Sequence, residues 1–537
     1  MASRMKRTAQ RAALLELGAA VAEEMKAGQG VDGTRTVADV LAMMPQATLE
    51  VMALIEKETR KRRPDAYLVA ALAYMAGQAL ELLRYGVERA DPAAEATLGE
   101  ARQRLLAHAR SDRADPTVLM LLAKQFAAAK LDIGETLRDA MGRLIAAEAE
   151  DVDDAGGGDL DMERHLAELG EELGDDPFAI HTELAETASS FPTEHRLAMA
   201  NFMLGSVSGA VRQAALGWLF DPEPQARVAV AEMLDEQARA GRLDPATLRR
   251  LVAGRNWLPA GERDKVDDGV RAARRKGTEP EPLPATKVLE AVASAFDGSG
   301  AGSVFVLVKT GRRHAVVSLL FKLDTGLRDA WVQRDLGKAE GRDLLDRVAG
   351  EIDVVDVSMD YVGRALRHFL GLQVAAGALP PFGALGAIEM LGLGSANPQV
   401  LSVDDVVAEA LAADPERDGD DEILAGSAAW FDHHGFMESW FEDDAAVDAA
   451  LKGRKGLSRI RKVDLVLEAV VAPQRRRWAE LLAWTALVTA EADDGKEEAA
   501  AFAVVAREML SDRPAGGIPL LRDIAEATVE ARRMRRQ

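Results

Sequence analysis

Six Asp-Pro pairs punctuate the chain, and most of them stand directly before apolar residues spaced three and four positions apart. They are Asp91-Pro92, Asp115-Pro116, Asp176-Pro177, Asp221-Pro222, Asp244-Pro245 and Asp414-Pro415. An Asp carboxylate accepts hydrogen bonds from the free amides of a first helical turn, and Pro fits the first helical position because that N–H would have no partner. Each pair therefore predicts the start of a helix, and together they constrain the chain to a mostly helical fold.

The apolar spacing between these pairs agrees with helices. One helical face is formed by Leu68, Leu72, Met75, Ala79 and Leu82. Hydrophobic residues make up 48% of the chain but aromatic residues only 5%, so Ala, Leu and Val must fill most of the interior. Strand-rich folds usually contain more aromatic residues. We therefore expect a mainly α fold, an irregular helical-repeat or multi-helix array.

Charge and cysteine content exclude several classes of function. The chain has no cysteine, which excludes disulfides, thiolate nucleophiles and Cys-based zinc or iron–sulfur sites. Its net charge of −22 repels phosphate backbones and argues against nucleic acid as the main ligand. The residues after the basic N-terminus lack the apolar core of an export signal, and the nearly uncharged run Phe369–Ile388 is not expected to span a membrane because Pro380-Pro381 stands at its middle. We predict a cytoplasmic protein with no cofactor.

Changes in composition divide the chain into six parts. These are an N-terminal helical block at 1–147, an acidic linker at 148–176, a second helical block at 177–277, a Pro/Gly-rich linker at 278–302, a small α+β module at 303–400 and a C-terminal helical region at 401–537. The first linker is predicted from its carboxylates and its Gly156-Gly157-Gly158 run, and it could include a short helix at 161–173. The second is predicted from Thr278–Pro284, which contains three prolines.

Part of the second helical block resembles a known repeat. Val211-Arg212 is followed by small apolar residues, and after Asp221-Pro222 the same pattern returns with Arg227-Val228 and Ala231. Over about residues 195–240 the chain resembles HEAT-type α-helical repeats, in which a turn rich in Asp precedes a helix that opens on Val-Arg. The resemblance implies a scaffold for contacts with other proteins.

The β meander is the non-helical part of the prediction. Strands are expected at Val304–Val308, Ala315–Phe321 and Ala330–Val332, with a further candidate strand at Ile352–Val357. The connecting turns contain Gly311 and Gly326. We predict a small antiparallel β meander at about 303–334, inserted in the C-terminal half of a mainly α protein.

The densest group of possible metal ligands is the segment around residues 432–444. If this segment is helical, His434 and Glu438 lie four residues apart on one face and could share a zinc or iron ion, with His433 adjacent. The same segment is crowded with Trp and Phe, so the favoured alternative is a packed aromatic helix with a polar rim. We therefore favour no metal site here and assign no catalytic residue.

A basic hairpin turn gives a candidate protein-binding site. Arg312, Arg313 and His314 stand at the turn between two expected strands, and Lys309 precedes them. On a shared sheet face they could dock an acidic peptide, or the chain's own acidic segment at 148–176. A turn that is simply solvated is the alternative.

These features together predict a non-catalytic protein-interaction scaffold or adaptor that binds another protein through a surface of stacked helices. Two alternatives stay open. One is a metal-dependent enzyme with a site around 432–444. The other is a regulatory subunit that acts through the acidic segment 148–176.

Overall fold

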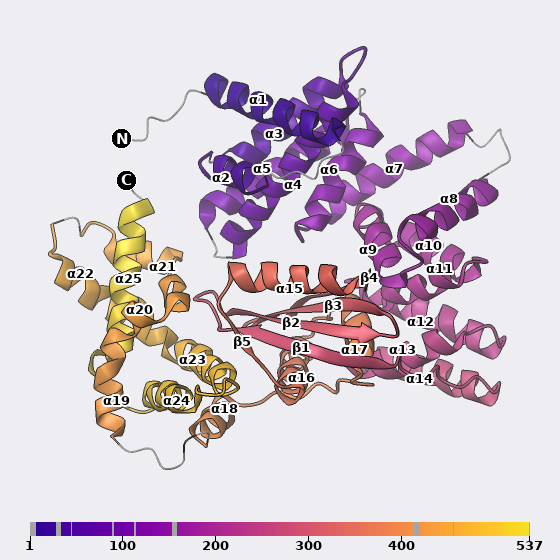
Figure 1. The fold of residues 1–537 in the computed structure, drawn as a ribbon. Helices are drawn as coiled ribbons and strands as arrows, with labels where there is room; N and C mark the ends of the chain where they lie inside the picture. The colour runs from indigo at the N-terminus through magenta and orange to yellow at the C-terminus, as the bar shows by residue number, and fades with distance from the viewer. Residues whose placement is uncertain are drawn as a thin grey trace. The chain divides into compact units, whose positions relative to one another are not determined.

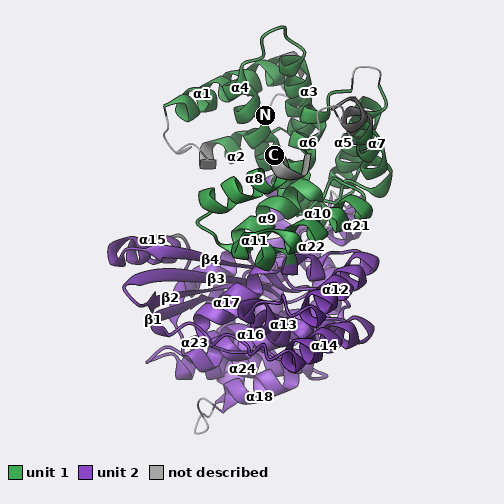
Figure 2. Ribbon diagram, turned by 90° about the vertical axis from the view of Figure 1, so that its right-hand side faces the viewer, with its two compact units in different colours: residues 1–215 green, residues 216–537 purple. Residues whose placement is uncertain are grey.

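The protein consists of two units. A computed structural model describes residues 7–27, 34–44, 46–88, 91–111, 114–152, 158–412, 414, 419–454 and 456–535. Contacts divide the chain into residues 1–215 and residues 216–537 (Figure 2). The described part of the first unit is helical, and the second holds one antiparallel sheet among further helices (Figure 1). The prediction of a mainly α protein with a small sheet in its C-terminal half is confirmed.

The first unit packs around α4 (Ala66–Glu88). This helix contacts α1 (Arg7–Lys26), α2 (Thr34–Ala42), α3 (Ala47–Thr59), α5 (Pro92–Ala109) and α6 (Pro116–Ala128). By length and composition alone α4 could cross a membrane, and here its residues form part of the apolar core between those five helices. The unit continues through α7 (Glu135–Val152), α8 (Gly158–Glu172), α9 (Pro177–Ala188), α10 (Thr193–Gly205) and α11 (Gly209–Ala214).

The acidic stretch at 148–176, expected to be a linker, is largely helical. Helix α7 continues into it as far as Val152, and α8 begins at Gly158. Residues 153–157 lie outside the described residues. The short helix considered at 161–173 corresponds to α8, where Leu166 is buried and gives the helix an apolar contact despite its many carboxylates.

The Asp-Pro pairs act largely as predicted. The Asp side chain accepts from first-turn amides at the starts of four helices, from Asp91, Asp115, Asp176 and Asp244. At Asp221-Pro222 the prediction is off by two residues. Helix α12 begins at Pro224 with Glu223 as its N-cap, while Asp221 accepts from the Glu223 amide at 2.8 Å and so shapes the turn before the helix. Pro415 of the last pair lies outside the described residues.

Buried ion pairs hold the first helices of the second unit. These helices are α12 (Pro224–Arg239), α13 (Pro245–Gly254) and α14 (Ala260–Arg275), with the 3₁₀ helix η3 (Arg255–Trp257) between the last two. Arg227 on α12 donates from Nε and Nη2 to the two carboxylate oxygens of Glu262 on α14, both at 2.7 Å. On α13, Arg250 donates to Glu389 in the same bidentate manner. The Arg of the Arg227-Val228 motif is therefore an internal tie between helices.

The sheet has five strands in the order β4-β3-β2-β1-β5, all antiparallel. They are β1 (Thr286–Ser294), β2 (Ala301–Thr310), β3 (Arg313–Lys322), β4 (Gly326–Leu336) and β5 (Val354–Asp356). The predicted meander corresponds to β2, β3 and β4, and the further candidate strand to β5. Strand β1 lies inside 278–302, which was expected to be a linker. The three prolines of that segment only precede the strand, which begins two residues after Pro284.

Helices cover both faces of the sheet (Figure 1). Helix α15 (Lys338–Glu351) packs on one face, where Leu345 joins Phe305, Leu307 and Val316 in a small apolar core. Helices α16 (Met359–Ala375) and α17 (Gly383–Leu391) pack on the other face. There Phe369 of α16 stacks on Phe321 with ring centroids 4.6 Å apart.

The C-terminal helices are fastened to the sheet through the turn that follows β1. The described helices are α18 (Val403–Leu411), α19 (Asp420–Gly426), α20 (Trp430–His433), α21 (Ala445–Leu451), α22 (Arg459–Val466), α23 (Arg475–Thr489), α24 (Lys496–Leu510) and α25 (Pro519–Arg535). The buried Trp440 donates from its indole N–H to the Phe296 carbonyl at 3.1 Å, and the Gly298 amide donates to the Ser439 hydroxyl at 2.9 Å. These bonds fix the second half of the expected 278–302 linker against the helices.

Candidate functional site

The segment at 432–444 does not have the helical geometry on which the candidate metal site depended. Helix α20 ends at His433, and His434 has extended backbone angles (φ −118°, ψ 106°) before the 3₁₀ helix η5 (Gly435–Ser439) begins. His434 and Glu438 therefore do not share one helical face, and the side chains of His433 and Glu438 are exposed. No cluster of three or more His, Asp or Glu side chains suited to a metal ion occurs among the described residues.

His434 belongs to an aromatic cluster. Its ring lies 5.1 Å from that of Phe502, 5.5 Å from that of Phe436 and 6.3 Å from that of Trp430, measured between centroids. Its Nδ1 lies 3.6 Å from a carboxylate oxygen of Glu498. Burial lowers the pKa of His434, and Glu498 acts in the opposite direction. The aromatic rings pack together as in the alternative that was favoured over a metal site, but the segment is not the continuous helix of that alternative, because α20 ends at His433.

The three residues of the basic hairpin turn differ in their exposure. Arg312 and Arg313 are exposed, whereas His314 is buried in β3. The Cβ of His314 lies close to Gly341 of α15, since a Cβ added to that glycine would be 3.5 Å away. Arg313 donates to the Asp335 carbonyl at 3.4 Å, on the neighbouring strand β4. His314 is therefore buried and does not join the two arginines on an open docking face.

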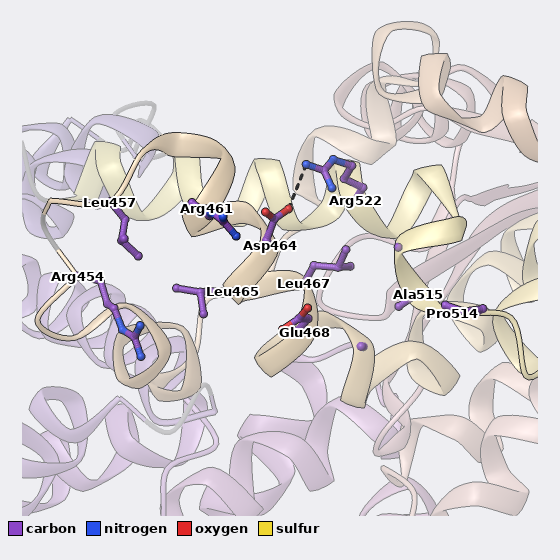
Figure 3. A pocket seen from close by; sticks show the side chains of 12 residues that line it. Arg454, Leu457, Arg461, Asp464, Leu465, Leu467, Glu468, Pro514, Ala515 and Arg522 are labelled. Atoms are coloured by element: carbon purple, nitrogen blue, oxygen red, sulfur yellow. Dashed lines mark hydrogen bonds and ion pairs between the residues drawn. The ribbon is translucent and has the colours of Figure 1, made fainter.

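An open groove of about 690 Å³ lies instead among the C-terminal helices (Figure 3). Helix α22 forms one wall and passes without a break into the π-helix η6 (Leu467–Val471) and the 3₁₀ helix η7 (Ala472–Gln474). The 3₁₀ helix η8 (Ala515–Gly517) and the start of α25 form the other wall. Single π-helical turns within α-helices occur frequently at functional sites.

Local sequence explains the shape of this groove. Gly453 adopts a left-handed conformation (φ 74°) after α21, which lets the chain reverse before α22. Ser458 caps α22 by accepting from the Arg461 amide. Across the groove, Pro514 precedes the short turn η8, and Pro519 starts α25.

The groove combines free positive charge with an apolar floor. The floor is built from half-buried Leu457 and Leu465 and buried Leu467, and Figure 3 shows Leu457 and Leu465 pointing toward the space between Arg454 and Arg461. Both arginines are exposed, and neither guanidinium has an ion pair or hydrogen bond recorded within the described part of the chain. Guanidinium groups in this state are available to carboxylates or phosphates.

The groove has two carboxylates, one paired with an arginine and the other exposed. Asp464 pairs with Arg522 of α25 at 3.3 Å (Figure 3), and Arg522 also lies 3.9 Å from Glu526. Glu468, on the π-helix, is exposed. Arg522 is thus largely neutralised by its neighbours, so Arg454 and Arg461 set the charge that a ligand meets.

The groove was not predicted from the sequence, although the sequence contains a signal for it. Between residues 452 and 462 stand six basic residues and no acidic one, in a chain of net charge −22: Lys452, Arg454, Lys455, Arg459, Arg461 and Lys462. The negative net charge of the whole chain gives no indication of this locally basic stretch. Counting charge segment by segment would have found it.

The chain is similar to y4lR proteins. The family model described as "Y4lR second domain" matches residues 192–277, and the one described as "Y4lR C-terminal helical domain" matches residues 404–533. The uncharacterized protein y4lR of Sinorhizobium fredii is 26% identical over 490 residues, which cover 87% of this chain and 88% of the relative. No solved structure matches the chain. The similarity to y4lR thus extends over most of this chain, and the groove lies within the part that resembles the Y4lR C-terminal helical domain.

Proposed function

We propose that the protein is a non-catalytic interaction scaffold and that the groove between α22 and α25 is a surface through which it binds another protein. The observation that carries this proposal is the pairing of two free guanidinium groups, on Arg454 and Arg461, with an open apolar floor. A floor of leucine side chains offers apolar contact, and charged groups at its rim orient a partner.

The architecture of the second unit supports the same proposal. Buried ties such as Arg227–Glu262 and Arg250–Glu389 hold helices side by side and use up their polar groups inside the fold. Helices held in this way present fixed outer faces, and a binding surface on fixed elements loses little conformational entropy when a partner docks. The groove itself is lined by α22, η6, η8 and the start of α25, and the ion pair between Arg522 and Asp464 joins α25 to α22.

A capture experiment with matched variants tests the proposal. The full chain is used as bait in extract of the native host, as wild type, as Arg454→Ala/Arg461→Ala and as Arg274→Ala/Arg275→Ala. The control removes the same charge from the exposed end of α14. We expect a defined protein partner to be retained by the wild type and the control and lost by the groove variant. A partner set that is identical for all three folded proteins would refute the assignment of the groove.

A further inference from the structure

Building on the proposed function, we infer that the groove binds an acidic segment of the partner that also carries an apolar side chain. Arg454 and Arg461 receive the carboxylates, and Leu457, Leu465 and Leu467 receive the apolar side chain. The partner is thus defined by its chemistry, a peptide segment in which Glu or Asp alternates with leucine-like residues.

The charge around the groove favours an anionic ligand at short range. Arg459 pairs with Glu526 at 3.1 Å, while Arg454 and Arg461 have no recorded carboxylate partner within the described residues. The protein as a whole is strongly acidic, yet at physiological salt its distant charges are screened beyond about 8 Å. A bound segment therefore experiences mainly the local arginines, and its carboxylates can form paired hydrogen bonds with each guanidinium.

The apolar floor separates a peptide from a simple anion. Leu467 is buried, while Leu457 and Leu465 are half-buried and form part of the lining, together with Pro514 and Ala515. A free phosphate or carboxylate would leave this floor in contact with water. An apolar side chain placed beside an acidic one would cover it, and burial of apolar surface favours binding.

The lining also argues against nucleic acid. None of the residues that form the groove is aromatic, so it offers no ring on which a base could stack. A continuous nucleic-acid backbone would place phosphates against the exposed carboxylate of Glu468, whereas the carboxylates of a peptide can lie at the two arginines alone. In a peptide complex the same Glu468 can accept a hydrogen bond from a backbone amide and so fix the direction of the segment.

Fluorescence anisotropy with a labelled peptide of alternating Glu and Leu tests the inference on the full chain. We expect this peptide to bind, a peptide with Lys in place of Glu not to bind, and one with Ser in place of Leu to bind at least about tenfold more weakly. Arg454→Ala/Arg461→Ala should weaken binding about tenfold or more, since each arginine contributes charged hydrogen bonds. Arg274→Ala/Arg275→Ala should bind as the wild type does, and added salt should weaken binding.

Several outcomes would overturn this inference. They are equal binding of the Lys peptide, no loss on changing the two groove arginines, and displacement of the peptide by an oligothymidine strand. If the alanine variant shows an altered circular dichroism spectrum, Arg454→Gln/Arg461→Gln replaces it, because Gln keeps much of the side-chain length without the charge.

The inference and the proposed function fail in different ways. A photo-crosslinker at Leu457 identifies the partner segment that occupies the groove, with a crosslinker at exposed Leu289 on β1 as the control position. A groove-dependent partner crosslinked through a neutral or basic segment would sink the inference and leave the proposed function standing. If the Glu and Leu peptide binds but no partner depends on the groove, the proposed function fails while the inferred peptide chemistry of the groove stands.

Discussion

The Arg227–Glu262 ion pair gives the sharpest test of how the second unit is held together. Both side chains are buried, with 8% and 10% of their surface exposed, and they join α12 to α14 through two hydrogen bonds of 2.7 Å. The remaining nitrogen of Arg227, Nη1, donates to the carbonyls of Asp221 and Pro222 at 2.8 and 2.9 Å. One guanidinium thus satisfies a carboxylate and the turn before α12.

The expected cost follows from what each change leaves behind. Glu262→Leu leaves a buried guanidinium without its counter-ion, and Arg227→Met leaves a buried carboxylate, so each single change should cost about 3–5 kcal/mol. In the double variant neither charge remains, and the main loss is the donor to the two carbonyls, about 2–3 kcal/mol. The sum of the single costs should therefore exceed the cost of the double change by at least about 2 kcal/mol.

Hydrogen exchange measured by mass spectrometry is the suitable assay, because a chain of two units need not unfold in one step. The exchange of peptides from α12 and α14 reports the free energy of opening of these helices. Glu232 and Lys265 supply an internal control, since they join the same two helices at 3.0 Å with 55% and 49% of their side chains exposed. Solvent screens that pair, so Glu232→Ala should change the exchange little.

Two results would refute this reasoning. Additive costs for the buried pair would mean that Arg227 and Glu262 stabilise the unit independently. Equal effects of the buried and the exposed pair would mean that burial does not determine what an ion pair contributes here.

Two further predictions concern stability. Gly298→Ala should lower the free energy of unfolding by about 3 kcal/mol or more, because a Cβ at this position would lie 1.8 Å from the Ser439 carbonyl oxygen. Gly261→Ala is the control, since a Cβ there meets open space and should leave stability unchanged. Melting temperatures of the two variants test the prediction. Burial and the nearby Glu526 raise the pKa of Asp523 to about 6 from 3.8, so its contribution to stability is full below 3.8 and is lost as the pH rises through 6. Asp523→Asn should therefore raise the melting temperature at about pH 7 and change it little at about pH 4; an equal gain at both values would contradict the assignment.

The helix starts were predictable because their cause is local. An Asp side chain and the ring of the following Pro act on amides two or three residues away, so the sequence contains all the groups involved. Asp115 shows this, since it accepts from the amides of Thr117 and Val118. Asp221 shows the limit, because a second proline, Pro224, takes the first helical position and leaves Asp221 to shape the turn.

Strand β1 was missed because its pairing is not local. It pairs with β2 from Thr286 to Ala293, apart from a bulge at Leu289, and it pairs with β5 over its last three residues. The sequence Lys287-Val288-Leu289-Glu290 carries a bulge and no clean alternation, so its strand character depends on a partner strand already in place. The interpretation of the prolines as a linker was therefore extended too far along the chain, into the residues that form β1.

The candidate metal site and the groove also differ in how far the local sequence determines them. The metal hypothesis for His434 and Glu438 depended on one assumption about local conformation, that the helix continues past His433, and the break there removed it. The groove depends on residues from α22 and from the turn before α25, whose meeting no local pattern predicts. Its charge, however, is local: the stretch 452–462 is basic whatever it folds against. A protein of net charge −22 that keeps two arginines of such a stretch free at the rim of an apolar groove combines local attraction for an acidic segment with an apolar contact surface. An acidic segment that also carries apolar side chains can use both at the groove, and this combination favours its binding there.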